Sequence, residues 1–211
     1  MTLRDYVAFH DHYDDPRSGL YLRLLVVQDL ISSVLDEAPP GPVRVISMCA
    51  GQGRDLIGVA RRHRRGRDLT GLLVEADPDN VAAGRDAIAR AGLGGLSIVQ
   101  GDAGRPAAYS GAVPTDLVLA CGIFGNISHE DIEQTIGFLP ALCAPGATVL
   151  WTRHPEPAEF LDTIQGWFAG AGFQPGPLVL PPGILFSVGS ARLTGTPPPF
   201  RAGQQLFTFV R

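Results

Sequence analysis

The stretch VRVISMCAGQGRDL, residues 43–56, passes from an apolar run through a glycine-containing turn into a helical pattern. A strand that ends in such a turn and opens a helix places free backbone N–H groups at the carboxyl edge of a parallel sheet, where doubly wound proteins bind ligands. Gly51 and Gly53 are present, but Leu56 stands where the dinucleotide fingerprint needs a third glycine, and the chain has no lysine for a phosphate-binding loop. The stretch therefore predicts an α/β fold whose ligand is not held through a phosphate.

Strand-like and helical runs alternate along most of the chain. The further strand-like runs cover 69–75, 96–101, 115–122 and 147–153. The helical patterns cover 19–36, 54–63, 78–92, 129–143 and 157–171. Such alternation indicates crossover connections and a parallel sheet that helices cover on both faces. Two Pro/Gly-punctuated β segments follow, 184–193 and 204–211, and we expect them to add a hairpin at the sheet edge.

The bulk properties narrow the class of protein. The chain has 211 residues with 45% hydrophobic content, which is enough for one domain. We expect an N-terminal lid and helical segment over 1–40 and a Rossmann-like core over 41–211. A net charge of -4 would not hold a polyanion, and no apolar run reaches the roughly 18 to 20 residues that span a bilayer. The first residues carry no secretory signal, and three cysteines without CxxC spacing fit reduced thiols and no metal site. These features favour a cytoplasmic protein without nucleic-acid, membrane or metal partners.

Acidic residues follow the second and third strand-like runs. Glu75 ends LLVE and can accept hydrogen bonds from the hydroxyls of a ribose. Asp102 follows IVQG and can accept from the exocyclic amine of an adenine at the same edge. Each also has a simpler explanation, because Glu75 can cap the helix that starts at Pro78 and Asp102 can form an Asx turn. Their order along the chain, together with the glycine turn, favours a nucleoside site.

With these landmarks the chain resembles the class I S-adenosylmethionine-dependent methyltransferases over residues 43–153. The resemblance is carried by VISMCAGQGRD, LLVEADP, IVQGDA and TDLVLACGIFGNI. It implies a doubly wound, Rossmann-like sheet of seven mostly parallel strands with a reversed C-terminal strand and helices on both faces. It also implies S-adenosylmethionine, which carries no phosphate, as the cofactor and a small molecule as the methyl acceptor. The cofactor-binding residues it implies are Cys49, Ala50, Gly51, Gly53, Asp55, Glu75, Ala76, Asp102, Ala103, Cys121 and Gly122.

The glycine turn departs from the usual pattern of that family. The family has an acidic residue at the position of Ser47 and a glycine at the position of Cys49. The carboxylate expected near the methionine ammonium is therefore missing from the first strand. Asp55 can replace that charge, or it can simply complement the dipole of the helix in whose first turn it lies.

The acceptor side of the site is expected to come from the N-terminal segment and the loops after the fourth and fifth strands. The substrate-binding residues implied are Tyr6, His10, Tyr13, Phe124, Asn126 and Arg153. The segment YVAFHDHYDD, residues 6–15, can fold over the crevice as a lid that excludes water, or it can be a poorly ordered terminus. Cys121 and Phe124 can likewise be buried packing residues at the end of a strand.

Methyl transfer to an oxygen or nitrogen is an in-line displacement that needs alignment and, for a poorly ionised acceptor, a base near pH 7. His129 and His154 are the two candidate bases. The alternative for each is a solvated histidine, and His129 can be an ordinary first-turn residue behind an N-cap at Ser128.

Three rival interpretations remain. The cluster RRHRRGR, residues 61–67, can bind RNA. Cations at this position also complement the negative end of the helix, and we expect this end to lie at the sheet edge opposite the ligand site. A non-catalytic cofactor-binding or scaffolding protein is the alternative function, and the altered turn favours it. A nicotinamide-dependent reductase is disfavoured by the missing third glycine. The chain is expected to act as a monomer or a homodimer.

Overall fold

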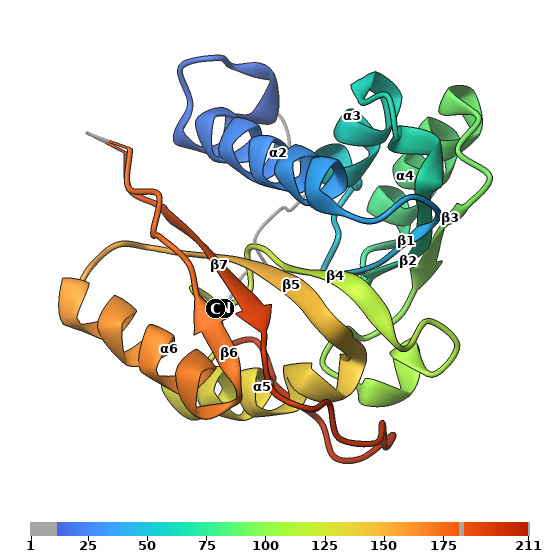
Figure 1. The fold of residues 1–211 in the computed structure, drawn as a ribbon. Coiled ribbons are helices and arrows are strands. Elements are labelled where there is room, and N and C mark those ends of the chain that lie inside the picture. Colours follow the sequence, from blue (N-terminus) through green and yellow to red (C-terminus); the bar gives the residue numbers. More distant parts are fainter. Residues whose placement is uncertain (1–11, 182–183, 211) are drawn as a thin grey trace.

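The structure is a computed structural model that describes residues 12–181 and 184–210. A sheet lies between two layers of helices, with α2, α3 and α4 on one side and α5 and α6 on the other (Figure 1). The strands are β1 (Val43–Met48), β2 (Leu69–Glu75), β3 (Leu96–Gln100), β4 (Thr115–Ala120), β5 (Cys143–Arg153), β6 (Phe173–Pro175) and β7 (Ser187–Leu193). The helices are α2 (Gly19–Glu37), α3 (Arg54–Arg62), α4 (Pro78–Ala91), α5 (His129–Leu142) and α6 (Ala158–Gly170). Short 3-10 turns are η1 (His12–Asp14), η2 (Gly66–Asp68) and η3 (Pro106–Tyr109).

The sheet has seven strands in the order β3-β2-β1-β4-β5-β7-β6. The first five strands of the chain are parallel to one another, and β7 pairs with β5 in the antiparallel sense from Thr148↔Arg192 to Arg153↔Ser187. The strand order reverses between β1 and β4, and open α/β sheets bind ligands beyond the carboxyl ends of the strands at such a switch point. The expected seven-stranded, mostly parallel sheet with a reversed C-terminal strand is confirmed.

The expected C-terminal hairpin is wrong. The segment 184–193 does supply β7, but its hairpin partner is β6, and 204–210 forms no strand. Leu206 and Phe207, each 3% exposed, are instead buried in the core, and the Leu206 N–H donates to Gly104 O at 2.7 Å. The β6 strand has three residues and ends at Pro175, so its sequence is too short to show a strand pattern. The strand prediction for the tail was wrong because its apolar side chains are buried individually in the core, whereas its backbone does not pair with a strand of the sheet.

Each central strand buries side chains on both faces. In β1, Ile46 packs on the side of α5 and α6, whereas Val45 packs on the side of α2 and α3. In β5, Trp151 packs on the side of α5 and α6, whereas Leu150 packs on the side of α2 and α3. Strands buried on both sides read as continuous apolar runs, which is why the sequence pattern located them.

Side-chain caps fix where the helices begin. Ser128 Oγ accepts from the Asp131 N–H at the start of α5, as the sequence predicted. Asp77 Oδ1 accepts from the N–H groups of Asp79 and Asn80 at the start of α4, whose first residue is Pro78. The α4 helix thus begins after only Ala76 and Asp77 beyond β2, whereas α5 begins after the longer loop 121–128 beyond β4.

The basic cluster at 61–67 ties helices together. Arg65, with a side chain 12% exposed, donates to four backbone carbonyls at and beyond the end of α2, those of Leu35, Ala38, Pro39 and Gly41. Arg62 donates to Gln28 at 2.6 Å and Arg64 to Asp36 at 2.8 Å. Arg65 thereby satisfies helix carbonyls that have no intrahelical partner.

No helix within 12–181 and 184–210 has the length and apolar character that crossing a membrane requires. The same residues bring no three His, Cys, Asp or Glu side chains together as metal ligands.

Candidate functional site

The turn after β1 is left-handed at three alternate positions. The φ angles are 50° at Cys49, 56° at Gly51 and 70° at Gly53, and Cys49 is the one non-glycine residue of the described chain with a positive φ. A Cβ atom at Gly53 would lie 2.7 Å from Leu73 and 2.9 Å from Ile57, so this position requires glycine. The turn therefore brings its backbone close to the ends of β1 and β2.

Glu75 holds this turn from the end of β2. Its carboxylate accepts from the N–H of Gly51 at 2.7 Å and from the N–H of Asp77 at 2.9 Å. A carboxylate offers about four lone-pair sites, so about two remain for other donors. The side chain is half-buried. The group that was predicted to bind ribose is thus fixed in orientation and still has acceptor capacity.

Asp102 lies beyond the end of β3, the neighbour of β2. Its Oδ1 accepts from the Gly104 N–H at 2.8 Å, which is the Asx turn considered above. Its Oδ2 receives Arg105 Nε and Gln205 Nε2, both at 3.3 Å. The side chain is 47% exposed, so an incoming donor can reach it.

Glu75 and Asp102 act on the same buried thiol. Burial raises the pKa of Cys49, and the negative charges of Glu75 and Asp102 raise it further. Tyr109, which is fully buried, donates to Ala103 O at 2.6 Å, and its pKa is also raised by burial and by Asp102. Both acids therefore lie near the Cys49 thiol, at the ends of the adjacent strands β2 and β3.

A second group of side chains, which we call the Asp55 group, lies beyond the ends of β1 and β4 and consists of Tyr13, Arg23, Arg54, Asp55 and Cys121. Burial raises the pKa of the Asp55 carboxyl, while its acceptor bond from the Leu56 N–H (2.7 Å) lowers it. The pKa of Cys121 is raised by burial and by the charge of Asp55, and it is lowered by Arg23. Arg23 Nη2 donates to Tyr13 Oη at 2.6 Å. Tyr13, Asp55 and Arg54 line a small cavity of about 40 Å³ here.

The end of the N-terminal segment is tied to the helix that follows the turn. Arg54 Nη1 bonds Asp14 at 2.7 Å, and its guanidinium lies 5.8 Å from the centre of the Tyr13 ring. Tyr13 therefore covers the glycine turn. Tyr6 and His10 lie outside the described residues, so the rest of the predicted lid stays a prediction.

The loop after β4 is held by the end of β5. The Gly122 N–H donates to Thr152 Oγ1 at 2.8 Å, and Asn126 Nδ2 donates to Gly122 O at 2.8 Å. Phe124 is fully buried and packs against Trp151 and Phe168 inside the core. The predicted substrate contact at Phe124 is therefore replaced by a packing role, which the sequence analysis had considered for residues at this strand end.

The two candidate bases differ in their surroundings. The His129 ring stacks on Phe160 with centroids 3.9 Å apart, and the Arg153 guanidinium lies 4.4 Å from the centre of that same ring. His154 is exposed, and its Nδ1 accepts from the Glu156 N–H at 3.2 Å. Phe160 brings His129 and Arg153 together, whereas His154 belongs to the turn before α6.

Two residues of the site were missed by the sequence analysis. Arg23 lies in the predicted helix 19–36 but was given no role in the site, and Gln205 was assigned to the expected strand 204–211. Arg23 reaches the Asp55 group because α2 packs against α3. Gln205 reaches Asp102 because the tail runs beside the loop after β3, where the Leu206 N–H donates to Gly104 O. Neither position follows from local spacing.

Comparison with known proteins adds the class of fold. No protein-family model and no curated protein matches the chain. The magnesium protoporphyrin IX methyltransferase ChlM from Synechocystis PCC 6803, solved with bound SAH, is 12% identical with a TM-score of 0.67, over 89% of this chain and 94% of that one. An O-methyltransferase family protein from Burkholderia thailandensis is 19% identical with a TM-score of 0.60, over 87% of this chain. The [4+2]-cyclase SpnF is 13% identical with a TM-score of 0.60, over 79% of this chain and 80% of that one.

This chain has the class I methyltransferase fold. It spans 62% of the length of the Burkholderia protein. The three identities lie between 12% and 19%, so the likeness is one of fold.

Proposed function

We propose that this chain is an enzyme that binds S-adenosylmethionine and transfers its methyl group to an oxygen or nitrogen of a small molecule. The observation that carries the proposal is the placement of Glu75 at the end of β2 and of Asp102 beyond the end of the adjacent strand β3, with Glu75 hydrogen-bonded to the glycine turn. Two carboxylates in this arrangement suit the hydroxyls of a ribose and the amine of an adenine. Methyltransferase structures with the same fold, one of them with bound SAH, support the choice of cofactor.

The chain's own groups fit such a cofactor along the crevice. Glu75 would receive the ribose hydroxyls through its remaining lone pairs, and Asp102 would receive the adenine amine. The buried Asp55 carboxyl would face the cationic methionine end and supply the charge that Ser47 does not. Asp55 forms no ion pair with a cation of the described residues, although the charge of Arg23 lowers its pKa from a greater distance, so a cationic ligand could still pair with this carboxyl.

The bound cofactor supplies an electrophilic methyl group on a positively charged sulfur. Gly122, fixed by Thr152, would let the acceptor approach beside the end of β4. His129 is the better placed of the two histidines to remove a proton, because its stack on Phe160 fixes the ring. Arg153, whose guanidinium lies over the same Phe160 ring, would contact the acceptor from the end of β5.

Calorimetric titration with S-adenosylmethionine and with SAH tests the binding step. We expect both compounds to bind saturably. We also expect SAH to be released when S-adenosylmethionine is incubated with a panel of small hydroxyl and amine acceptors. Absence of binding by either compound contradicts the proposal. His129→Asn is expected to lower the turnover rate, whereas His154→Asn leaves it close to that of wild type.

A second function is a cofactor-binding protein that transfers no methyl group. The serine and cysteine in the turn favour it, and a [4+2]-cyclase shares the fold. Cofactor binding without SAH release across the acceptor panel would select this alternative. A reductase that uses a nicotinamide is disfavoured by the missing third glycine, and an absorbance assay for hydride transfer tests it.

The remaining parts of the proposal concern the setting of the protein. Three free cysteines, Cys49, Cys121 and Cys143, support a reducing cytoplasmic location. The engagement of Arg62, Arg64 and Arg65 within the fold supports a small-molecule partner over RNA. Sedimentation analysis is expected to find a monomer or a homodimer.

A further inference from the structure

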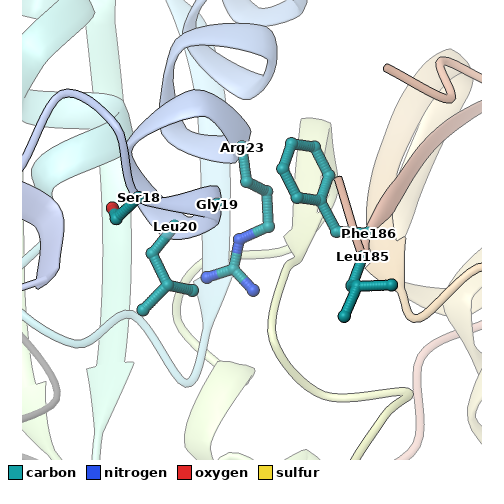
Figure 2. Close-up of a pocket in the computed structure, with 6 residues that line it drawn as sticks. All are labelled: Ser18, Gly19, Leu20, Arg23, Leu185 and Phe186. Atoms are coloured by element: carbon teal, nitrogen blue, oxygen red, sulfur yellow. The ribbon is translucent and has the colours of Figure 1, made fainter. Parts of the chain in front are cut away.

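A separate cavity of about 270 Å³ lies between the start of α2 and the start of β7. The described residues that line it are Ser18, Gly19, Leu20, Arg23, Leu185 and Phe186. In Figure 2 the Arg23 side chain extends into the space between Leu20 on one side and the Leu185–Phe186 segment on the other. The cavity thus has apolar walls and a guanidinium inside it.

This cavity lies beside the ends of β4 and β5. Ser187, the residue after Phe186, pairs with Arg153 at the end of β5, and the neighbouring Thr152 receives the Gly122 N–H. Arg23 is also close enough to Cys121 to lower the pKa of that thiol. A molecule in the cavity would therefore lie next to the end of β4.

Arg23 forms no ion pair with a carboxylate of the described residues. Within residues 12–181 and 184–210, Tyr13 is its hydrogen-bond partner, and Asp55 is near enough for the charge of Arg23 to lower the pKa of that carboxyl but lies beyond ion-pair distance. Burial raises the pKa of Tyr13, so the phenol that accepts from Arg23 stays neutral and does not balance the charge of the guanidinium. One N–H of the guanidinium serves Tyr13, and the others remain for a ligand.

We propose that this cavity binds the methyl acceptor and that the acceptor is a small carboxylic acid with an apolar body. The carboxylate pairs with Arg23, and the body packs against Leu20, Leu185 and Phe186. A single planar guanidinium matches a carboxylate, whereas a phosphate in a protein site usually meets several donors. This identification of the acceptor class rests on the proposed methyl transfer, but the anion site itself does not.

Benzoate and benzamide are suitable probes because they share a ring and differ in charge. Each is titrated into the full chain, with and without saturating SAH, while the methyl resonances of Leu20 and Leu185 are followed by NMR. The expected result is saturable shifts of both leucines with benzoate and binding of benzamide that is weaker by roughly 10-fold or more, as for loss of a charged hydrogen bond. Equal binding of the two probes, or no saturable shift at these leucines, overturns the proposal.

Two variants and a control assign the charge. Arg23→Gln is expected to lower the affinity for benzoate to that for benzamide. Arg23→Lys is expected to bind benzoate more tightly than benzamide. Arg17→Gln is the matched control, because Arg17 precedes the same helix, is 91% exposed and pairs with Asp15. Benzoate binding that survives Arg23→Gln contradicts the proposal. If Arg23→Gln does not fold, the preference of wild type and Arg23→Lys for benzoate over benzamide decides.

The cofactor is measured separately on the same samples. Arg17→Gln is expected to bind SAH as wild type does, and the SAH affinity of Arg23→Gln is compared with that control, because the charge of Arg23 also acts on Asp55. A chain that binds benzoate through Arg23 but binds neither S-adenosylmethionine nor SAH would refute the proposed function and leave the anion site standing. A chain that binds SAH but not benzoate would refute only the acceptor class.

Discussion

Glu75 Oε2 accepts a hydrogen bond from the backbone N–H of Gly51 at 2.7 Å, so the end of β2 holds the turn that ends β1. This bond links the acid directly to the glycine turn. The proposed ribose acceptor and the backbone proposed to approach the cofactor are therefore positioned by one another.

Glu75→Gln is expected to weaken the binding of SAH by roughly 10-fold or more. The amide removes the charge and turns an N–H₂ toward one of two backbone N–H groups, so charged hydrogen bonds of about 1.5–3 kcal/mol are lost. Calorimetry measures the change. Glu133→Gln, at an exposed position of α5, is the control and should bind as wild type does. Equal affinities for both variants would remove Glu75 from the site.

Asp55→Asn is expected to raise the melting temperature at neutral pH. Burial raises the pKa of Asp55, so the folded state holds its proton at a higher pH than the unfolded state does. The associated stability is complete below the unfolded pKa, about 4, and is lost as pH rises through the raised folded pKa. The asparagine variant avoids that loss, so its advantage should shrink as the pH falls toward about 4.

Asp55→Asn is also expected to lower the affinity for S-adenosylmethionine at neutral pH, because the cationic ligand loses the carboxylate with which it would pair. Asp162→Asn, at an exposed position of α6, should change neither melting nor binding. Thermal scans at several pH values and calorimetry report the two effects independently. An asparagine variant that melts below wild type at every pH would show that the charge of Asp55 is satisfied without a ligand.

Gly53→Ala is expected to lower the free energy of unfolding by about 1–3 kcal/mol. Its φ of 70° is unfavourable for a side chain, and the new methyl would press on Leu73 and Ile57. Gly111→Ala is the matched control, since nothing lies within 4 Å of a Cβ there. Urea denaturation compares the two. A Gly53→Ala protein as stable as the control would show that the turn tolerates a side chain.

Leu206→Ala is expected to destabilise the protein by about 2–4 kcal/mol, the range for removing a buried leucine side chain. Leu206 is 3% exposed although it belongs to a tail without a strand. Val210→Ala, at a residue 53% exposed, should have little effect. Chemical denaturation monitored by tryptophan fluorescence measures both. Similar small losses would mean that the tail packs only weakly on the sheet.

The sheet and the strand-end acids were predictable because their signals are local. Doubly buried strands such as β1 and β4 read as apolar runs, and Glu75 and Asp102 follow such runs directly. The tail was not predictable, because Phe207 is buried by contact with a distant part of the chain. Arg23 was missed for the same reason, since only tertiary packing brings α2 beside Cys121.

The central strands contain buried apolar side chains along their length, whereas the polar side chains of the candidate site, such as Glu75 and Asp102, stand at or just beyond their ends. Substitution inside a strand has only to preserve volume and apolar character, whereas substitution one residue beyond it alters the reactivity of the crevice. Two chains can therefore share this fold while differing at most of their residues, as the 12% identity to a protein of TM-score 0.67 illustrates. What such chains have in common is the layout of their strand ends, and what distinguishes them is the set of side chains placed there.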